Sequence, residues 1–210
     1  IPSKVSDNKY LGADYIAGGL RLFYNAHPWT FLRPVTTFAT VAAYSTGTIT
    51  IVAGVVALSG GTFPTAAADR DLPVGGLPYT VNARNSGTQL TLDDLTVTAA
   101  AGSTYVLAKP VYDLPDGFGG FDGPLTYVPG QACLAGEVII TDEVHIRRMR
   151  QRYDFTGRPI WGALRPKTFA AATGQRRQLA LLPIPDAIYN YEYRYVVQPD
   201  LITGTDIYTY

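Results

Sequence analysis

The 210-residue chain has a mass of 22.7 kDa, and its 17 basic side chains balance 17 acidic ones. This formal net charge of zero excludes a global attraction to nucleic acid or to an anionic membrane. Hydrophobic residues make up 47% of the chain, charged residues only 16%, and tyrosine occurs fifteen times, which predicts a folded, strand-rich protein whose neutral surface contacts other proteins.

No apolar run reaches the roughly 18 residues that a membrane-spanning helix needs. The longest candidate, residues 49–61, is interrupted by glycines. No signal peptide is recognisable at the start of the sequence, and the single Cys133 has no second cysteine for an internal disulfide. We therefore expect a soluble protein of a reducing compartment that makes no contact with membranes.

The first predicted element is a helix over residues 6–26, with Ser6, Asp7 and Asn8 as candidate caps. Three glycines inside it, at positions 12, 18 and 19, each cost about 1 kcal/mol relative to alanine. We therefore expect a neighbouring backbone to pack closely against this helix. Its apolar residues recur at three- and four-residue spacings: Leu11, Tyr15, Ile16, Leu20, Phe23 and Tyr24.

The segment after the predicted helix indicates that the helix ends abruptly. Pro28 bars continuation of the helix. Trp29, Phe31 and Leu32 are expected to fold back under the helix end as an aromatic plug. The predicted structural anchors are therefore Pro28, Trp29 and Phe31, together with Trp161 in the second half of the chain.

Residues 36–112 change to a Thr-, Val-, Gly- and Ala-rich composition with short alternating runs, which predicts an inserted β module. The step Ser86-Gly87 marks a hairpin. The strand candidates are TGTITIVAG (46–54), LPYTVNAR (77–84), TQLTLDD (88–94) and STYVLAKPVY (103–112). A small barrel or sandwich buries one face of such strands, and the expected inward residues are Ile49, Ile51, Tyr79, Val81, Leu90 and Leu92.

The second half of the chain begins with residues 114–130, a Pro- and Gly-rich run without periodicity that predicts a loop. A strand over residues 133–141 and a short basic helix over residues 141–154 follow. Residues 178–185 and 187–197 predict an antiparallel pair. Alternate residues of its second strand form a tyrosine ladder on one face: Tyr189, Tyr191, Tyr193 and Tyr195.

Together these elements predict an α+β fold. Its small helical part consists of the N-terminal helix and the short basic helix, and it carries an inserted β-barrel or sandwich module and a C-terminal antiparallel β pair. The expected domains are a core formed by residues 1–35 and 113–210 and the β module of residues 36–112.

The sequence contains only weak motifs for catalysis, phosphate binding or metal binding. His27, His145 and Cys133 have no partner at a motif spacing, which favours packed or solvated side chains over a catalytic role. The run GFGGFDG (117–123) lacks the lysine and the strand-to-helix setting of a phosphate-binding loop. We expect no enzyme activity and no catalytic, cofactor-binding or metal-binding residues. Six aspartates at no calcium-binding spacing are expected in turns and caps: Asp69, Asp71, Asp93, Asp94, Asp116 and Asp122.

Positive charge is concentrated in residues 141–180, which contain nine Lys or Arg against three acids. Three interpretations are open: contact with carboxylates of a neighbouring subunit or partner, nonspecific contact with DNA phosphates, and a solvated face. The candidate subunit or DNA-channel contacts are Arg147, Arg148, Arg150, Arg152, Arg176 and Arg177.

The order of the segments carries a family resemblance. The early helix ends in LRLFYNAHPWTFLRP (20–34), and the β insertion, LPDGFGG (114–120) and the short basic helix follow. The chain then continues through TGRPIWGAL (156–164) and QLALLPIPDAIYNYEYRYVVQPDLIT (178–203). This order, over most of the chain, resembles the head-to-tail adaptor, or connector, proteins of tailed bacteriophages.

The resemblance implies a structural virion protein without catalysis. Copies are expected to form a cyclic homo-oligomer of about twelve below the portal protein. The ring would continue the DNA channel, contact genomic DNA nonspecifically and dock the next tail or neck protein. The implied location is the neck of the virion, between capsid and tail, after assembly in the host cytoplasm.

The β module suggests a different class of function. Thr- and Gly-rich modules with exposed tyrosines occur in tail fibres and carbohydrate-binding domains, where aromatic rings stack on sugars. A fibre protein is expected to be a trimer or to bind glycans, whereas a connector forms a large ring on a portal.

Overall fold

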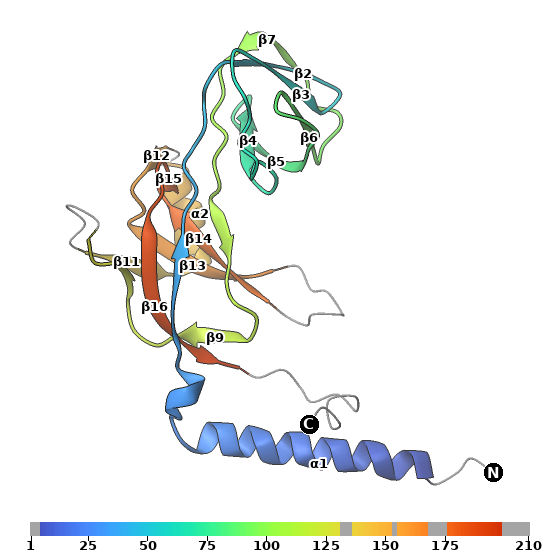
Figure 1. Cartoon of the computed structure of the whole chain (residues 1–210), viewed down its shortest axis with the longest axis vertical. Coiled ribbons are helices and arrows are strands. Elements are labelled where there is room, and N and C mark those ends of the chain that lie inside the picture. The colour runs from blue at the N-terminus through green and yellow to red at the C-terminus, as the bar shows by residue number, and fades with distance from the viewer. Residues whose placement is uncertain (1–4, 131–135, 153–154, 168–175, 199–210) are drawn as a thin grey trace.

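The computed structural model describes residues 5–130, 136–152, 155–167 and 176–198. Two β units follow one another along the molecule, and a long helix, α1 (Val5–Ala26), lies across the end opposite the smaller unit (Figure 1). A short 3-10 helix, η1 (Thr30–Leu32), joins α1 to the larger unit. A second helix, α2 (Glu143–Arg150), packs on the larger unit.

The larger unit is an eight-stranded sheet in which strands from both ends of the described chain meet. Its main path runs β1-β16-β10-β11-β13-β14-β8, and β9 also pairs with β16. Within this sheet only β11 and β13 pair in parallel. The strands are β1 (Val35–Ala39), β8 (Val111–Asp113), β9 (Phe118–Phe121), β10 (Leu125–Tyr127), β11 (Glu137–Thr141), β13 (Trp161–Pro166), β14 (Arg177–Leu182) and β16 (Asn190–Val197).

The smaller unit, called the β module below, is a curled six-stranded antiparallel sheet in the order β4-β5-β6-β3-β2-β7. Its strands are β2 (Thr48–Val52), β3 (Val55–Ser59), β4 (Asp71–Val74), β5 (Leu77–Arg84), β6 (Gln89–Leu92) and β7 (Ala99–Ser103). A separate parallel pair, β12 (Thr156–Gly157) with β15 (Ile184–Pro185), completes the described strands.

The predicted α+β fold class is wrong, because the chain is mostly β, with 46% strand and 14% helix. The N-terminal helix is present, but strands also build the region predicted as a small helical core. Two of them, β9 and β10, lie inside residues 114–130, which were predicted to be a loop. Gly119 permits this, since a Cβ there would lie 2.9 Å from the carbonyl oxygen of Val196 on the adjacent strand.

The predicted pairing of residues 178–185 with 187–197 is also wrong. β14 pairs with β13 and β8, whereas β16 pairs with β1, β10 and β9. Pro183 and Pro185 lie between β14 and β16 and have no N–H for a hairpin ladder. The chain instead passes through β15, and the two strands take separate places in the same sheet.

The short basic helix is present but spans only Glu143–Arg150, with Asp142 at its N-cap. Its Ile146 is only 3% exposed and packs with Ala163 and Leu182, which belong to β13 and β14. Met149 packs against the same cluster, so two apolar side chains fix the helix to the sheet, while Val144 is exposed.

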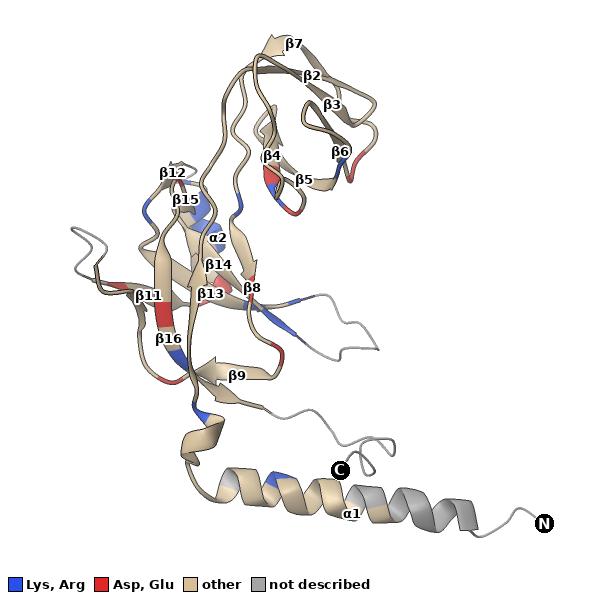
Figure 2. Ribbon diagram, in the orientation of Figure 1, with Lys and Arg blue, Asp and Glu red and all other residues tan. Residues whose placement is uncertain are grey.

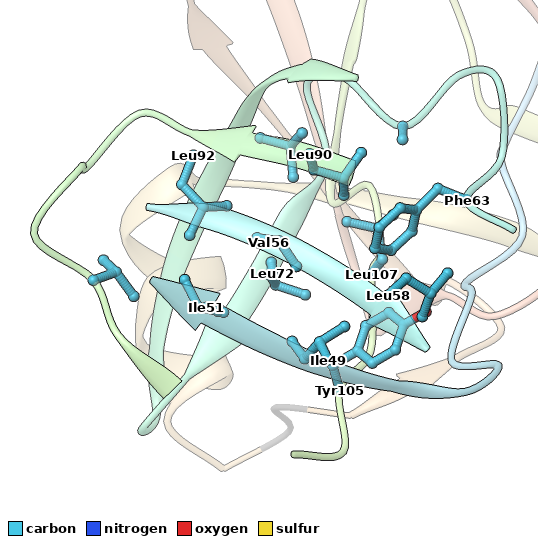
Figure 3. Close-up of a cluster of buried hydrophobic side chains, with 13 residues drawn as sticks. Ile49, Ile51, Val56, Leu58, Phe63, Leu72, Leu90, Leu92, Tyr105 and Leu107 are labelled. Carbon is cyan, nitrogen blue, oxygen red and sulfur yellow. The ribbon is translucent and has the colours of Figure 1, made fainter. Parts of the chain in front are cut away.

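The core of the β module agrees with the sequence pattern. Five of the six expected inward residues are at most 1% exposed, and among these Ile49, Ile51, Leu90 and Leu92 lie in one buried cluster (Figure 3). The sixth, Tyr79, packs against the same cluster. The predicted hairpin at Ser86-Gly87 is confirmed, because β5 and β6 pair on either side of it.

The tyrosine ladder of β16 is confirmed, but it faces inward. Tyr191 is fully buried, Tyr193 is 3% exposed, and Tyr189 and Tyr195 pack against the same cluster. Burial raises the pKa of Tyr193 to about 12, since the ionised phenolate would lose its hydration. These tyrosines therefore form a core, and the expectation that tyrosines provide a neutral contact surface does not hold for this strand.

Leu90→Ala should lower the free energy of unfolding by about 2–5 kcal/mol, because a fully buried side chain is replaced by a cavity. The matched control Leu77→Ala, at a position 60% exposed in the same unit, should change it by less than about 0.5 kcal/mol. Urea denaturation measures both values. Equal losses in the two variants would contradict the assigned core.

Candidate functional site

The most exposed apolar surface lies on α1. Tyr15 and Leu22 are seven residues apart, as are Ile16 and Phe23, so each pair shares a helix face. A Cβ built on Gly12, Gly18 or Gly19 would meet nothing within 4 Å, so the backbone is open there. No described residue supplies the close neighbour that the sequence predicts for this helix. The exposed fractions are Tyr15 79%, Leu22 75%, Ile16 49% and Phe23 46%.

An aromatic cluster fixes the end of α1. The Trp29 ring stacks on Phe23 with a centroid separation of 4.6 Å, and its Nε1 donates a hydrogen bond to the Phe23 carbonyl at 2.8 Å. His27 packs edge-on against Trp29 at 4.9 Å. Pro28 lies between these two residues in the sequence, just after the end of α1. Phe31 differs from the anchoring role expected for it, since it is 62% exposed.

Three charged residues attach this cluster to the larger sheet. Arg33, just after η1, lies 3.1 Å from Asp122 Oδ2, and the Arg194 Nε on β16 lies 2.8 Å from the same oxygen. One carboxylate therefore bridges two guanidinium groups from distant parts of the sequence. Sequence reasoning missed this arrangement, because no local pattern relates residues 161 positions apart.

The basic residues of α2 do not act as one patch. Arg147 pairs with Glu143 one turn earlier, and Arg150 is partly buried and faces a cleft between the two units. Arg148 and Arg152 are four residues apart and exposed, and within the described residues neither makes an ion pair. Arg148 on α2 and Arg152 in the turn that follows it are therefore available to meet an external anion.

Lys167, Arg176 and Arg177 lie at the end of β13 and β14 that is far from α2 (Figure 2). Arg176 Nε lies 2.8 Å from Asp116 Oδ1, while Arg177 is exposed at the start of β14. Lys167 Nζ lies 2.7 Å from Asp113 Oδ2. Acidic residues of the same chain thus neutralise part of the excess positive charge that the sequence shows.

The Asp113–Lys167 ion pair shifts the pKa of both residues. Burial alone opposes ionisation of Asp113, but hydrogen bonds from Lys167 and Gln178 outweigh it and hold the pKa of Asp113 below its usual value. The hydrogen bond to Asp113 also raises the pKa of Lys167. Both charged forms are therefore favoured in the folded state.

The sequence also singles out Trp161, His145 and Cys133. Trp161 on β13 packs against the cluster of Ile146, Ala163 and Leu182, so it helps to hold α2. His145 is exposed on α2, away from His27. Cys133 lies outside the described residues.

The aspartates considered for calcium binding have other partners or positions. Asp94 Oδ1 accepts hydrogen bonds from the Thr96 N–H at 2.8 Å and the Thr96 hydroxyl at 2.6 Å, as in a turn. Asp116 and Asp122 form the ion pairs described above. Among the described residues, no three His, Cys, Asp or Glu side chains gather closely enough to hold a metal ion.

Comparison with known proteins gives no relative. A scan against family models, a search of curated proteins and a search of solved structures each found no match to this chain. Over the described residues, neither helix combines the length and the hydropathy needed to span a bilayer.

Lys167→Met should destabilise the protein by less than about 1 kcal/mol, since the ion pair is largely exposed. The free energy of unfolding of the variant should be lower than that of the wild type between about pH 4 and 10. This difference should shrink when the pH falls through the depressed pKa of Asp113, and also when the pH rises through the raised pKa of Lys167. Urea denaturation across pH measures this difference, with Arg21→Met, at an exposed position of α1, as the control. A difference independent of pH would contradict the pairing.

Proposed function

We propose that the chain is a structural head-to-tail connector, which assembles into a ring of about twelve copies below the portal of a tailed phage and docks the next neck or tail protein. The observation that carries this proposal is the exposed apolar face of α1, defined by Tyr15, Ile16, Leu22 and Phe23. A helix with such a face, held at its base by packed aromatic rings, is suited to insertion against another subunit.

Assembly through α1 follows from its composition. The glycines at positions 12, 18 and 19 leave the helix backbone accessible, so a neighbouring subunit can approach it closely. A contact between α1 of one copy and a different surface of the next is heterologous, and such contacts close into a ring when the rotation fits. The aromatic cluster and the Asp122 ion pairs set the direction of the helix, and with it the rotation between copies.

The proposed ring continues the DNA channel, and Arg148 on α2 and Arg152 just after α2 are the candidate contacts to phosphates. They are exposed and lie four residues apart, which matches the nonspecific electrostatic contact that a passing duplex requires. The other candidates contribute less, because Arg147 and Arg176 are paired with acids of the same chain.

The alternative, a sugar-binding module, is disfavoured by the positions of the aromatic residues. In the β module Phe63 is 1% exposed and Tyr105 is 6% exposed, and Tyr79 packs against the same core. Stacking on a sugar ring needs an exposed aromatic face. The described surface of the β module offers aliphatic side chains instead, such as Val52, Leu77 and Leu95.

Tyr15→Glu/Leu22→Glu should abolish ring formation, because two carboxylates would have to be buried without partners at the subunit contact. The control Leu77→Glu/Leu95→Glu changes two exposed residues of the β module, at 60% and 59% exposure, and should assemble normally. Mass photometry gives the size of the assembly, and circular dichroism checks the fold. Rings formed by the α1 variant, or lost equally in the control, would contradict the role of α1.

Arg148→Glu/Arg152→Glu should leave the ring mass unchanged and reduce retention of packaged DNA, because charge reversal repels phosphates. The comparison variant Lys167→Glu/Arg177→Glu reverses the charges at the far end of β13 and β14. Released DNA is quantified after assembly of each variant with filled capsids. A loss of DNA confined to the comparison variant would show that α2 does not face the channel.

A further inference from the structure

A cleft of about 670 Å³ separates the two β units, away from the α1 face. Asp71, Pro73 and Pro78 of the β module line one wall, and Arg150, Phe155 and Ile184 of the larger unit line the other. This volume lies within the usual range of ligand sites, which often form between structural units. Most of the lining is apolar, so the cleft favours an occupant with apolar side chains.

The cleft is preformed, because hydrogen bonds fix the β module to the chain segments that join the units. The Asp71 N–H donates to the Ala108 carbonyl at 2.7 Å, and the Ala108 N–H donates back at 3.1 Å. The buried Arg70 donates to the carbonyls of Ala66 and Ala42 at 2.6 and 3.0 Å. A bound segment would therefore meet walls whose positions are already set.

The charges of the cleft favour a neutral occupant that donates hydrogen bonds, because the charges of Asp71 and Arg150 offset each other. Asp71 presents a carboxylate on one wall and Arg150 a guanidinium on the other. Within the described residues, the Asp71 carboxylate accepts only a 3.4 Å hydrogen bond from the Thr80 hydroxyl. Burial raises the pKa of Asp71, which reflects the loss of its hydration. The N–H groups of a peptide backbone are suitable donors to such an acceptor.

A second, independent feature points to a peptide. Thr156 of β12 pairs with Ile184 in a parallel register in which the Ile184 N–H donates to the Phe155 carbonyl. In that register the N–H and C=O of Thr156 point away from β15. No third strand pairs with β12 within the described residues. Thr156 also lines the cleft, so an open strand edge and apolar walls occur in one place.

We propose that this cleft binds an extended, uncharged segment of another protein chain, which pairs with the free edge of β12 and places an apolar side chain between Pro73, Pro78 and Phe155. Main-chain hydrogen bonds to β12 give such a complex its register, and the apolar walls select the side chain. The site is separate from α1 and does not depend on the proposed ring.

The test selects peptides that bind the purified chain from a display library of random dodecapeptides. A selected peptide is then synthesised, and its Kd for the chain is measured by fluorescence anisotropy. Val106→Trp fills the cleft with a larger side chain, and Thr156→Pro removes only the N–H that points away from β15. Each variant should raise the Kd at least about tenfold. The control Val52→Trp, at an exposed position outside the cleft, should leave it unchanged.

Selected peptides should be uncharged and rich in β-branched or aromatic residues. Thermal melting of each variant checks that it is folded, and Thr156→Pro provides the test if Val106→Trp is unstable. A library that yields no binder would overturn the proposal, as would a selected peptide whose Kd is unaffected by both cleft variants.

Discussion

The buried face of β16 is the interaction on which the larger unit depends. Tyr191 stacks on Phe38 of β1 at 5.1 Å and packs against Tyr127 of β10 at 4.7 Å, so one side chain joins three strands. Its hydroxyl lies 3.3 Å from that of Tyr127, which donates to the Pro159 carbonyl and accepts from Arg158. Satisfied hydroxyls allow these large rings to fill the core without stranded polar atoms.

The same strand sets the position of the proposed assembly surface. β1 pairs with β16 along its whole length, and η1 and the aromatic cluster directly precede β1. Arg194 of β16 binds Asp122, which also holds Arg33. The direction of α1 is therefore determined by the packing of a strand far along the sequence, and a change in the β16 core would alter how copies meet.

Local sequence patterns predicted the elements that depend on neighbouring residues. The helix of residues 5–26, the hairpin at Ser86-Gly87 and the inward side chains of the β module follow from spacing and turn chemistry. Pairing between distant strands was not predictable, because β14 and β16 look like a hairpin locally. The partners of Lys167 and Arg176 were not predictable either, because Asp113 and Asp116 lie in other segments of the chain.

The central claim is that exposed α1 surfaces join copies of this chain into a ring on a portal. The most direct measurement is mass photometry of the protein mixed with purified portal rings. The account predicts an added mass of about twelve chains on the portal, and the loss of that mass in Tyr15→Glu/Leu22→Glu. A trimer, or a monomer that leaves the portal mass unchanged, would contradict it.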